Sequence, residues 1–210
     1  MNLLFAHGWG FDAAFWEPLA ALLPEHAHVI DDRGYFGAPT PAEIEGPCLA
    51  VTHSFGTMRV LSDPPPGLVG IVAFNGFDRF SARTGRAGVP VRVIDRMLRR
   101  FIQSPETVLA EFRATCGDTA PVPTPVPDPL REDLLRLRDG ECPTPAVPLT
   151  SVQGRADPLL AREMRESVFP RGELRRVSHA GGHLLPVEDP AFCAETVRAI
   201  LAEAGRFAAE

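Results

Sequence analysis

The sequence predicts an α/β fold in which helices cover a mostly parallel sheet of about six strands. Short apolar runs alternate with longer mixed segments along the 210 residues, which is typical of strands that are buried on both faces. The chain is 45% apolar and 23% charged, the composition of a single globular domain. A chain of this length buries about 70% of its unfolded surface, so its core needs no metal or disulfide to be stable.

Six short apolar runs mark the expected strands. The first run, residues 2–6, leads into the loop His7-Gly8-Trp9-Gly10, and an amphipathic helical stretch around Trp16 then extends to Pro24. The other five runs are residues 28–31, 47–52, 68–74, 148–152 and 173–177. A last helix is expected from about Pro190 to Ala208, where apolar residues recur at helical spacing.

Between the fourth and fifth expected strands the pattern becomes helical, with proline-rich breaks. An apolar stripe from Val93 to Phe101 predicts one helix. The order Ser104-Pro105-Glu106 predicts the start of a second helix, with a capping serine, a first-turn proline and an acidic residue. We therefore expect a core formed by residues 1–77 and 143–210, and a helical lid formed by residues 78–142.

A third lid helix is expected after a run of prolines. Residues 121–129 read PVPTPVPDP, which predicts an extended polyproline stretch. Asp128-Pro129 can cap a helix whose apolar residues include Leu130, Leu134 and Leu137.

The most informative motif surrounds Ser54. An apolar strand runs directly into Thr52-His53-Ser54-Phe55-Gly56, and a helix follows. In a nucleophile elbow, a serine on such a strained strand-to-helix turn exposes its hydroxyl, and the next backbone N–H faces the developing oxyanion. Thr52 stands where the pattern G-x-S-x-G has its first glycine. A serine after a strand is by itself more often a helix cap, so this motif needs support from the rest of the chain.

Three further loops supply that support, because each follows an expected strand. The loop from His7 to Gly10 can add a backbone N–H to that of Phe55, although it could also be an ordinary glycine turn with a buried tryptophan. Asp157 follows the fifth strand and His183 the sixth. The chain order Ser, Asp, His is that of hydrolases of this type. Since the carboxyl ends of parallel strands meet at one edge, the four elements are expected to converge there.

Within this set, some residues have competitors. We prefer His183 to His179 as the base because Gly181-Gly182 lets a loop present it, which leaves His179 a supporting role. Asp157 is preferred to Asp78, which follows the fourth strand. His53 is expected to shape the pocket wall. We expect no metal site at His179 and His183, because the two glycines between them disfavour a helix.

On these motifs the sequence resembles the α/β-hydrolase superfamily, and within it the BioH-type esterases, which demethylate pimeloyl-acyl-carrier-protein methyl ester in biotin synthesis. The segments that carry the resemblance are Ala6–Gly10 with Trp16, Thr52–Gly56, Val108–Ala114, His183–Leu185 and Asp189–Cys193. The resemblance covers nearly the whole chain.

The resemblance implies a cofactor-free serine carboxylesterase acting through an acyl-enzyme. It implies the triad Ser54, His183 and Asp157, with the backbone N–H groups of Trp9 and Phe55 as the oxyanion hole. It also implies that the substrate contacts Trp9 and Phe55, together with the lid residues Phe112, Arg113 and Cys116.

Three departures from the superfamily pattern leave the substrate open. The usual N-terminal hairpin is expected to be missing, and only about a dozen residues join the second and third strands, too few for a full helix. Thr52 replaces the first elbow glycine. The alternatives are a general carboxylesterase, lactonase or thioesterase, or a non-catalytic scaffold that binds a small apolar ligand. A nicotinamide or flavin domain is excluded because no G-x-G-x-x-G follows a strand.

The charge of the chain and its distribution limit the classes of molecule that the protein is expected to bind. All 21 basic residues are arginine, so chemistry that depends on lysine is excluded, and the net charge of −6 argues against a nucleic-acid binder. Residues 78–113 hold eight arginines and four acids, a charge of +4, which leaves −10 on the rest of the chain. Such a basic lid suits an acidic partner, and we expect acyl carrier protein to dock there. The competing interpretation is a solvated helix face in an arginine-biased proteome.

The four cysteines are far apart and form no C-x-x-C pair, which disfavours a zinc ribbon or a thioredoxin-like redox site. The sequence shows no secretory signal and no apolar run of the roughly 20 residues that a membrane span requires. We therefore expect a cytoplasmic protein with reduced thiols that pack as small apolar groups.

Overall fold

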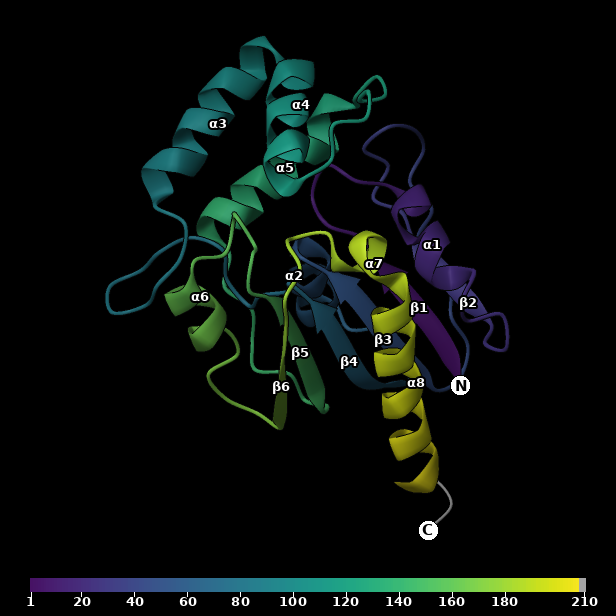
Figure 1. The fold of residues 1–210 in the computed structure, drawn as a ribbon. Helices are drawn as coiled ribbons and strands as arrows, with labels where there is room; N and C mark the ends of the chain where they lie inside the picture. Colours follow the sequence, from purple (N-terminus) through teal and green to yellow (C-terminus); the bar gives the residue numbers. More distant parts are fainter. Residues whose placement is uncertain (208–210) are drawn as a thin grey trace.

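The computed structural model describes residues 1–207 and contains a six-stranded sheet in the order β2-β1-β3-β4-β5-β6 (Figure 1). All five strand pairings are parallel. The strands are β1 (Asn2–Ala6), β2 (His28–Asp31), β3 (Cys48–His53), β4 (Leu68–Phe74), β5 (Leu149–Gly154) and β6 (Leu174–His179). The prediction of an α/β fold with six strands is confirmed.

Helices cover both faces of this sheet. They are the 3-10 helix η1 (Ala13–Trp16) and the α-helices α1 (Glu17–Ala20), α2 (Phe55–Ser62), α3 (Val91–Gln103), α4 (Pro105–Cys116), α5 (Pro127–Asp139), α6 (Arg162–Ser167), α7 (Leu185–Glu188) and α8 (Pro190–Phe207). The expected last residue of the final helix, Ala208, lies outside the described residues. No helix within residues 1–207 is long and apolar enough to cross a membrane.

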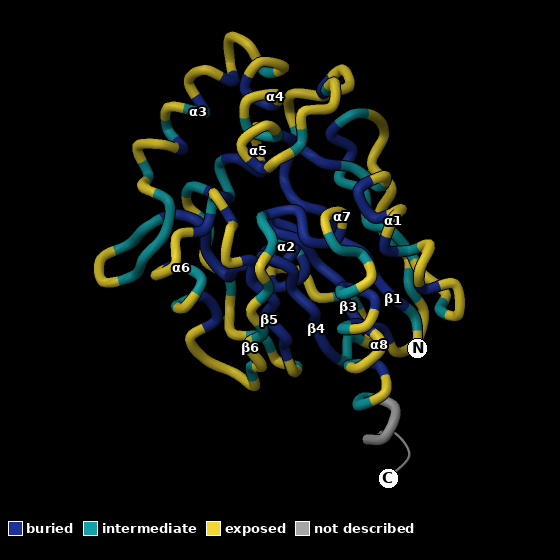
Figure 2. Tube along the Cα trace, viewed as in Figure 1, coloured by how far each residue is buried: buried dark blue, intermediate teal, exposed yellow. Residues whose placement is uncertain are grey.

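The core consists of two apolar layers, one on each face of the sheet. Alternate residues of the central strands point to opposite faces, so Leu4 and Ala50 join one layer with α2 and the helices α3–α5. Leu3 and Val51 join the other layer, together with η1, α1 and α8. Figure 2 shows the central strands buried, whereas the exposed residues lie mainly in the outer helices, the loops and the edge strand β6. This two-sided burial explains why the strands are apolar without alternation.

Helices α3, α4 and α5 lie between β4 and β5 in the chain and gather above the carboxyl ends of the strands (Figure 1). The segment 78–142 is therefore helical, as expected. Its division from a core of residues 1–77 and 143–210, and its action as a lid, stay predictions. No helix joins β2 to β3, in agreement with the short connection expected there.

The predicted start of α4 is confirmed, with Ser104 at the cap position, Pro105 as the first residue and Glu106 in the first turn, although the Ser104 side chain makes no capping hydrogen bond. The predicted start of α5 needs correction. Helix α5 begins at Pro127, so Asp128 and Pro129 lie inside its first turn instead of capping it, and the extended stretch ends at Val126. The physical reason is that a proline in the first turn already has a helical φ, and the N–H it lacks would be unpaired there in any case.

The four cysteines are free thiols. Three of them, Cys48, Cys116 and Cys193, are buried among apolar residues, and Cys142 is half-buried. They pack as small apolar groups, as the sequence predicts.

The start of α2 lies against the end of β1 with no room for a side chain between them. A Cβ atom on Gly56 would lie 2.1 Å from the carbonyl oxygen of Ala6 and 2.7 Å from that of His7. These neighbours are backbone atoms of a central strand, so they cannot move aside without disturbing the sheet. Gly56 is therefore required by packing.

We predict that Gly56→Ala lowers the free energy of unfolding by about 2–4 kcal/mol, because the added methyl group overpacks a rigid site. Gly37→Ala is the matched control, since a Cβ atom there meets nothing within 4 Å, and it should change stability by less than about 1 kcal/mol. Urea denaturation of the two variants measures the difference. Equal stability would show that α2 and β1 can separate freely.

Candidate active site

Ser54 lies on a strained turn between β3 and α2. Its backbone has φ 52° and ψ −124°, a region that residues with a side chain rarely adopt. The strain is held in place by a hydrogen bond from the Ser54 N–H to the carbonyl of Phe74 on β4, at 3.1 Å. The Ser54 side chain makes no capping hydrogen bond to α2. The competing prediction, that this serine is only a helix cap, is therefore wrong.

The hydroxyl of Ser54 instead points to an imidazole and a carboxylate. Ser54 Oγ lies 3.1 Å from Nε2 of His183, and Nδ1 of His183 lies 2.7 Å from Oδ2 of Asp157. The other carboxylate oxygen of Asp157 accepts the N–H groups of Leu159 and Leu160. With Asp157 accepting the Nδ1 proton, Nε2 is left free to accept the proton of the serine.

All three side chains are shielded from water. Ser54 is 5% exposed, Asp157 7% and His183 0%. Low exposure strengthens hydrogen bonds between such groups, because little water competes for them. The structure thus brings together the serine, aspartate and histidine selected from the sequence, and their catalytic role stays a prediction.

The loop that carries His183 is shaped by Glu188 of α7. The Glu188 carboxylate accepts the N–H groups of Gly182, at 2.6 Å, and of Leu184, at 3.1 Å. A Cβ atom on Gly181 or Gly182 would lie 2.8 Å from the same carboxylate. The glycine pair is therefore present because Glu188 occupies the space that side chains would need.

Asn75, directly after β4, is a supporting residue that the sequence analysis missed. It is fully buried with φ 48°. Its amide donates to the carbonyls of Gly182, at 2.8 Å, and His183, at 2.7 Å, and its Oδ1 accepts the Gly154 N–H at 2.7 Å. One side chain thus ties the end of β4 to the end of β5 and to the histidine loop. The available signal was an asparagine at a strand's carboxyl end, a residue type that tolerates positive φ.

His53 holds the same loop from the other side. Its Nε2 donates to the carbonyl of His183 at 3.0 Å, and its ring stacks on Phe15 with centroids 4.4 Å apart. Complete burial and the neighbouring His183 lower the pKa of His53 well below its usual value, so the ring is neutral. His53 therefore supports the loop of His183, and its expected role in shaping the pocket wall stays a prediction.

The competing candidates are engaged elsewhere. His179 lies 3.3 Å from Asp189 and packs against the ring of Phe192. Asp78 pairs with Arg86 at 2.8 Å and accepts the N–H of Phe169. Within residues 1–207 no group of three or more histidine, cysteine or acidic residues could hold a metal ion.

The expected oxyanion groups lie beside the serine. A Cβ atom on Gly8 would be 3.0 Å from Cβ of Ser54, so the loop from His7 to Gly10 passes directly next to the hydroxyl. Among the described residues, neither Trp9 nor Phe55 gives its backbone N–H to an acceptor. Two unused donors next to Ser54 are what an oxyanion hole requires, and this role stays a prediction.

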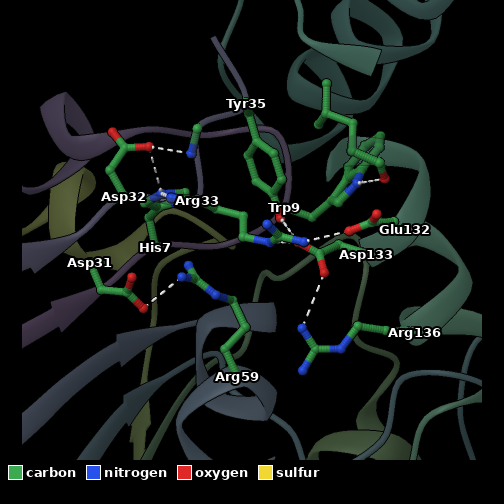
Figure 3. Close-up of polar contacts among 12 residues, drawn as sticks. His7, Trp9, Asp31, Asp32, Arg33, Tyr35, Arg59, Glu132, Asp133 and Arg136 are labelled. Carbon is green, nitrogen blue, oxygen red and sulfur yellow. Dashed lines mark hydrogen bonds and ion pairs between the residues drawn. The ribbon is translucent and has the colours of Figure 1, made fainter. Parts of the chain in front are cut away.

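Helix α5 packs against the loop from His7 to Gly10. The indole Nε1 of Trp9 donates to the carbonyl of Leu130 at 2.8 Å. The Arg136 guanidinium lies 5.3 Å over the ring of Phe55. Figure 3 shows Trp9 and Arg136 close to Asp133.

A buried carboxylate, Asp133, lies at the centre of the contacts between α5 and this loop, and it is 0% exposed. Its Oδ2 accepts the Tyr35 hydroxyl and the Arg33 Nε, each at 2.8 Å, and its Oδ1 accepts an N–H of Arg136 at 3.1 Å (Figure 3). Burial and the Asp133 charge raise the pKa of Tyr35 well above its usual value, so the phenol stays a donor. Arg33 also gives its backbone N–H to His7, which links the network to the oxyanion loop.

The expected substrate-contacting residues of α4 lie over the same site. The Phe112 ring packs edge-on against Trp9, with centroids 4.9 Å apart. Arg113 lies over the ring of Phe11 and binds Asp118 at 2.8 Å, so its charge is already neutralised. Burial, with Asp157 nearby, raises the pKa of Cys116 and leaves an unreactive thiol. The contacts of these residues with substrate stay predictions.

Thr52 is accommodated at the elbow by a partner hydroxyl. Its Oγ1 lies 2.7 Å from Oγ1 of Thr57 on α2, and both residues are buried. A Cβ atom on Gly76 would lie 2.2 Å from Thr57 Oγ1. The space that the first elbow glycine usually leaves is therefore filled by a threonine pair, and Gly76 provides the room for it.

Comparison with known proteins identifies the fold. No family model and no curated protein sequence matches this chain. An esterase from Exiguobacterium antarcticum superposes with a TM-score of 0.80 at 15% identity, covering 96% of this chain and 92% of that one. A thermophilic esterase from Thermogutta terrifontis gives 0.73 at 16% identity, covering 97% and 90%. The enol-lactonase from Burkholderia xenovorans LB400 gives 0.63 at 17% identity, covering 95% and 90%. The chain has the α/β-hydrolase fold.

We predict that Asn75→Asp slows the reaction of Ser54 with a fluorophosphonate probe by about 10–100-fold. The new carboxylate faces the carbonyls of Gly182 and His183, and this repulsion misplaces the imidazole. Measuring the labelling rate of the variant and of the original protein over a range of pH tests this effect.

The matched control for this experiment is Asn2→Asp, which breaks only an exposed hydrogen bond to Glu45. It should label at the rate of the original protein. An Asn75→Asp protein with an unchanged rate and pH profile would remove Asn75 from the supporting role.

Proposed function

We propose that this chain is a serine carboxylesterase that cleaves esters of small acyl groups. The observation that carries the proposal is the continuous hydrogen-bonded chain from Ser54 through His183 to Asp157, with the serine on a strained elbow. Those of the similar structures that are named by activity are esterases and hydrolases, which agrees with this chemistry.

The geometry suggests a two-step reaction. His183 accepts the proton of Ser54 as the hydroxyl attacks the ester carbonyl, and Asp157 holds the imidazole in position and stabilises its positive charge. The backbone N–H groups of Trp9 and Phe55 receive the developing oxyanion, which is commonly the largest single contribution to such catalysis. The alcohol leaves with the proton from His183, and water then hydrolyses the acyl-enzyme.

The narrower proposal for the substrate is the methyl ester of pimeloyl-acyl-carrier protein. It rests on the motif resemblance and on the outer face of α3, where Arg92, Arg96 and Arg99 are exposed and make no ion pair within the described residues. Such a face suits an acidic carrier protein. The broader alternative is a carboxylesterase, lactonase or thioesterase on a free acyl substrate, and the named esterases and enol-lactonase among the similar structures favour this broader class.

We predict that Ser54→Ala lowers kcat for short p-nitrophenyl esters by about 10⁴–10⁶-fold, because the nucleophile is lost. Ser62→Ala, at the exposed end of α2, is the matched control and should retain full activity. Labelling by a fluorophosphonate probe should disappear in the first variant only. Retained turnover in Ser54→Ala would contradict the proposal, and no labelling of the original protein would favour a non-catalytic scaffold.

For the substrate, we predict that expression of this chain restores growth without biotin to a strain that lacks its own pimeloyl methyl esterase. The Ser54→Ala chain, expressed at the same level, should not restore growth. If the purified protein cleaves p-nitrophenyl esters and yet fails to support growth, the broader alternative replaces the biotin-pathway substrate.

A further inference from the structure

A hollow lies beside the edge strand β6. Helix α6 packs near this edge of the sheet (Figure 1). Its volume is about 410 Å³, within the range of pockets that hold small molecules. It is lined by Gln153, Arg155, Arg162, Arg165, Glu166, Arg176, Val177 and Ser178. None of the triad or oxyanion residues lines this hollow, so it is separate from the site around Ser54.

The lining is strongly basic in a protein whose net charge is −6. It contains four arginines and one acid, and Glu166 is paired with Arg162 at 2.7 Å. The other three arginines have no carboxylate partner within the described residues. Guanidinium groups around one hollow repel one another, and an anion between them relieves that repulsion.

One of these arginines is held in a fixed orientation by the backbone. Arg176 donates to the carbonyl of Val168 at 2.6 Å and to that of Arg165 at 3.3 Å. These acceptors anchor the guanidinium to α6 without neutralising its charge. Arg155 and Arg176 are both exposed to solvent, so an anion from solution can reach them.

We propose that the hollow is a binding site for a small phosphate monoester. The phosphate would sit among Arg155, Arg165 and Arg176, and the volume of the hollow leaves room for the organic group. Phosphate suits this arrangement better than a carboxylate, because three anionic oxygens match three unpaired guanidinium groups, whereas one arginine can already saturate a carboxylate.

A larger neighbouring hollow of about 810 Å³ shares Arg176 and Glu166 with this one. Its Arg86 is already paired with Asp78 and with Glu141. That hollow therefore lacks the unneutralised charge of the smaller one. The phosphate site is assigned to the smaller hollow for this reason.

Isothermal titration of the full chain at low ionic strength, with glycerol 3-phosphate, inorganic phosphate, glycerate and glycerol, tests the proposal. Glycerol 3-phosphate and inorganic phosphate should both bind, glycerate about 10-fold more weakly, and glycerol not at all. Arg155→Gln should weaken glycerol 3-phosphate about 10-fold, and Arg155→Gln with Arg176→Gln about 100-fold. Arg92→Gln on α3 removes the same charge from an exposed arginine outside the hollow and should leave the affinity unchanged.

The proposal is overturned if no phosphate compound binds, if Arg155→Gln and Arg92→Gln weaken binding equally, or if glycerate binds as tightly as glycerol 3-phosphate. Cleavage of p-nitrophenyl esters should be the same in Arg155→Gln as in the original protein, so the outcome does not depend on the proposed esterase.

Discussion

The close approach of α2 to the end of β1 is the constraint on which the candidate site depends. Because Gly56 has no side chain, the first turn of α2 lies directly against the carbonyls of Ala6 and His7. This contact brings the Ser54 hydroxyl and the Phe55 N–H beside the loop that follows β1. It also forces Ser54 into its strained conformation, which costs on the order of 1–3 kcal/mol. The surrounding sheet, through the bond from Ser54 to Phe74, holds the residue in that conformation.

Each member of the candidate triad, or the loop that carries it, is held in place by hydrogen bonds. Ser54 is held by β4, the loop of His183 is held by Asn75, His53 and Glu188, and Asp157 is fixed by the N–H groups that follow it. The groups are thus oriented before any substrate arrives. Such preorganisation limits the reorganisation needed during a reaction.

The sequence predicts the strands well and the supporting contacts poorly, for identifiable physical reasons. An apolar run that is buried on both faces leaves a local signal, and the loops around Ser54, Asp157 and His183 follow from chain order. Asn75 acts on partners 79 to 108 residues away, and Asp133 on Tyr35, 98 residues away. The pattern of neighbouring residues cannot indicate contacts between residues that are so far apart in the sequence. The prolines at 127 and 129 likewise overrode the predicted cap.

Charge summed over a segment was also an incomplete guide to the surface. The predicted basic lid is partly neutralised by acids outside residues 78–113, as in the pairs of Arg86 with Glu141 and Arg113 with Asp118. Local charge in the sequence does not indicate the basic hollow beside β6, because its arginines are spread from residue 155 to residue 176 along a stretch that also contains acids. Pairing in three dimensions, which composition cannot show, decides where charge remains available.

The helices above the candidate site differ in how firmly they are held. Helix α5 is attached through the buried Asp133, which accepts hydrogen bonds from the buried Tyr35 and from Arg33. Helix α4 meets the oxyanion loop through the edge-on contact of Phe112 with Trp9, and such an aromatic pair contributes only about 1 kcal/mol beyond its buried area. Ser54 is 5% exposed, so a substrate needs a path past one of these helices. We therefore expect opening of the site to involve α4, while α5 keeps the oxyanion loop in place.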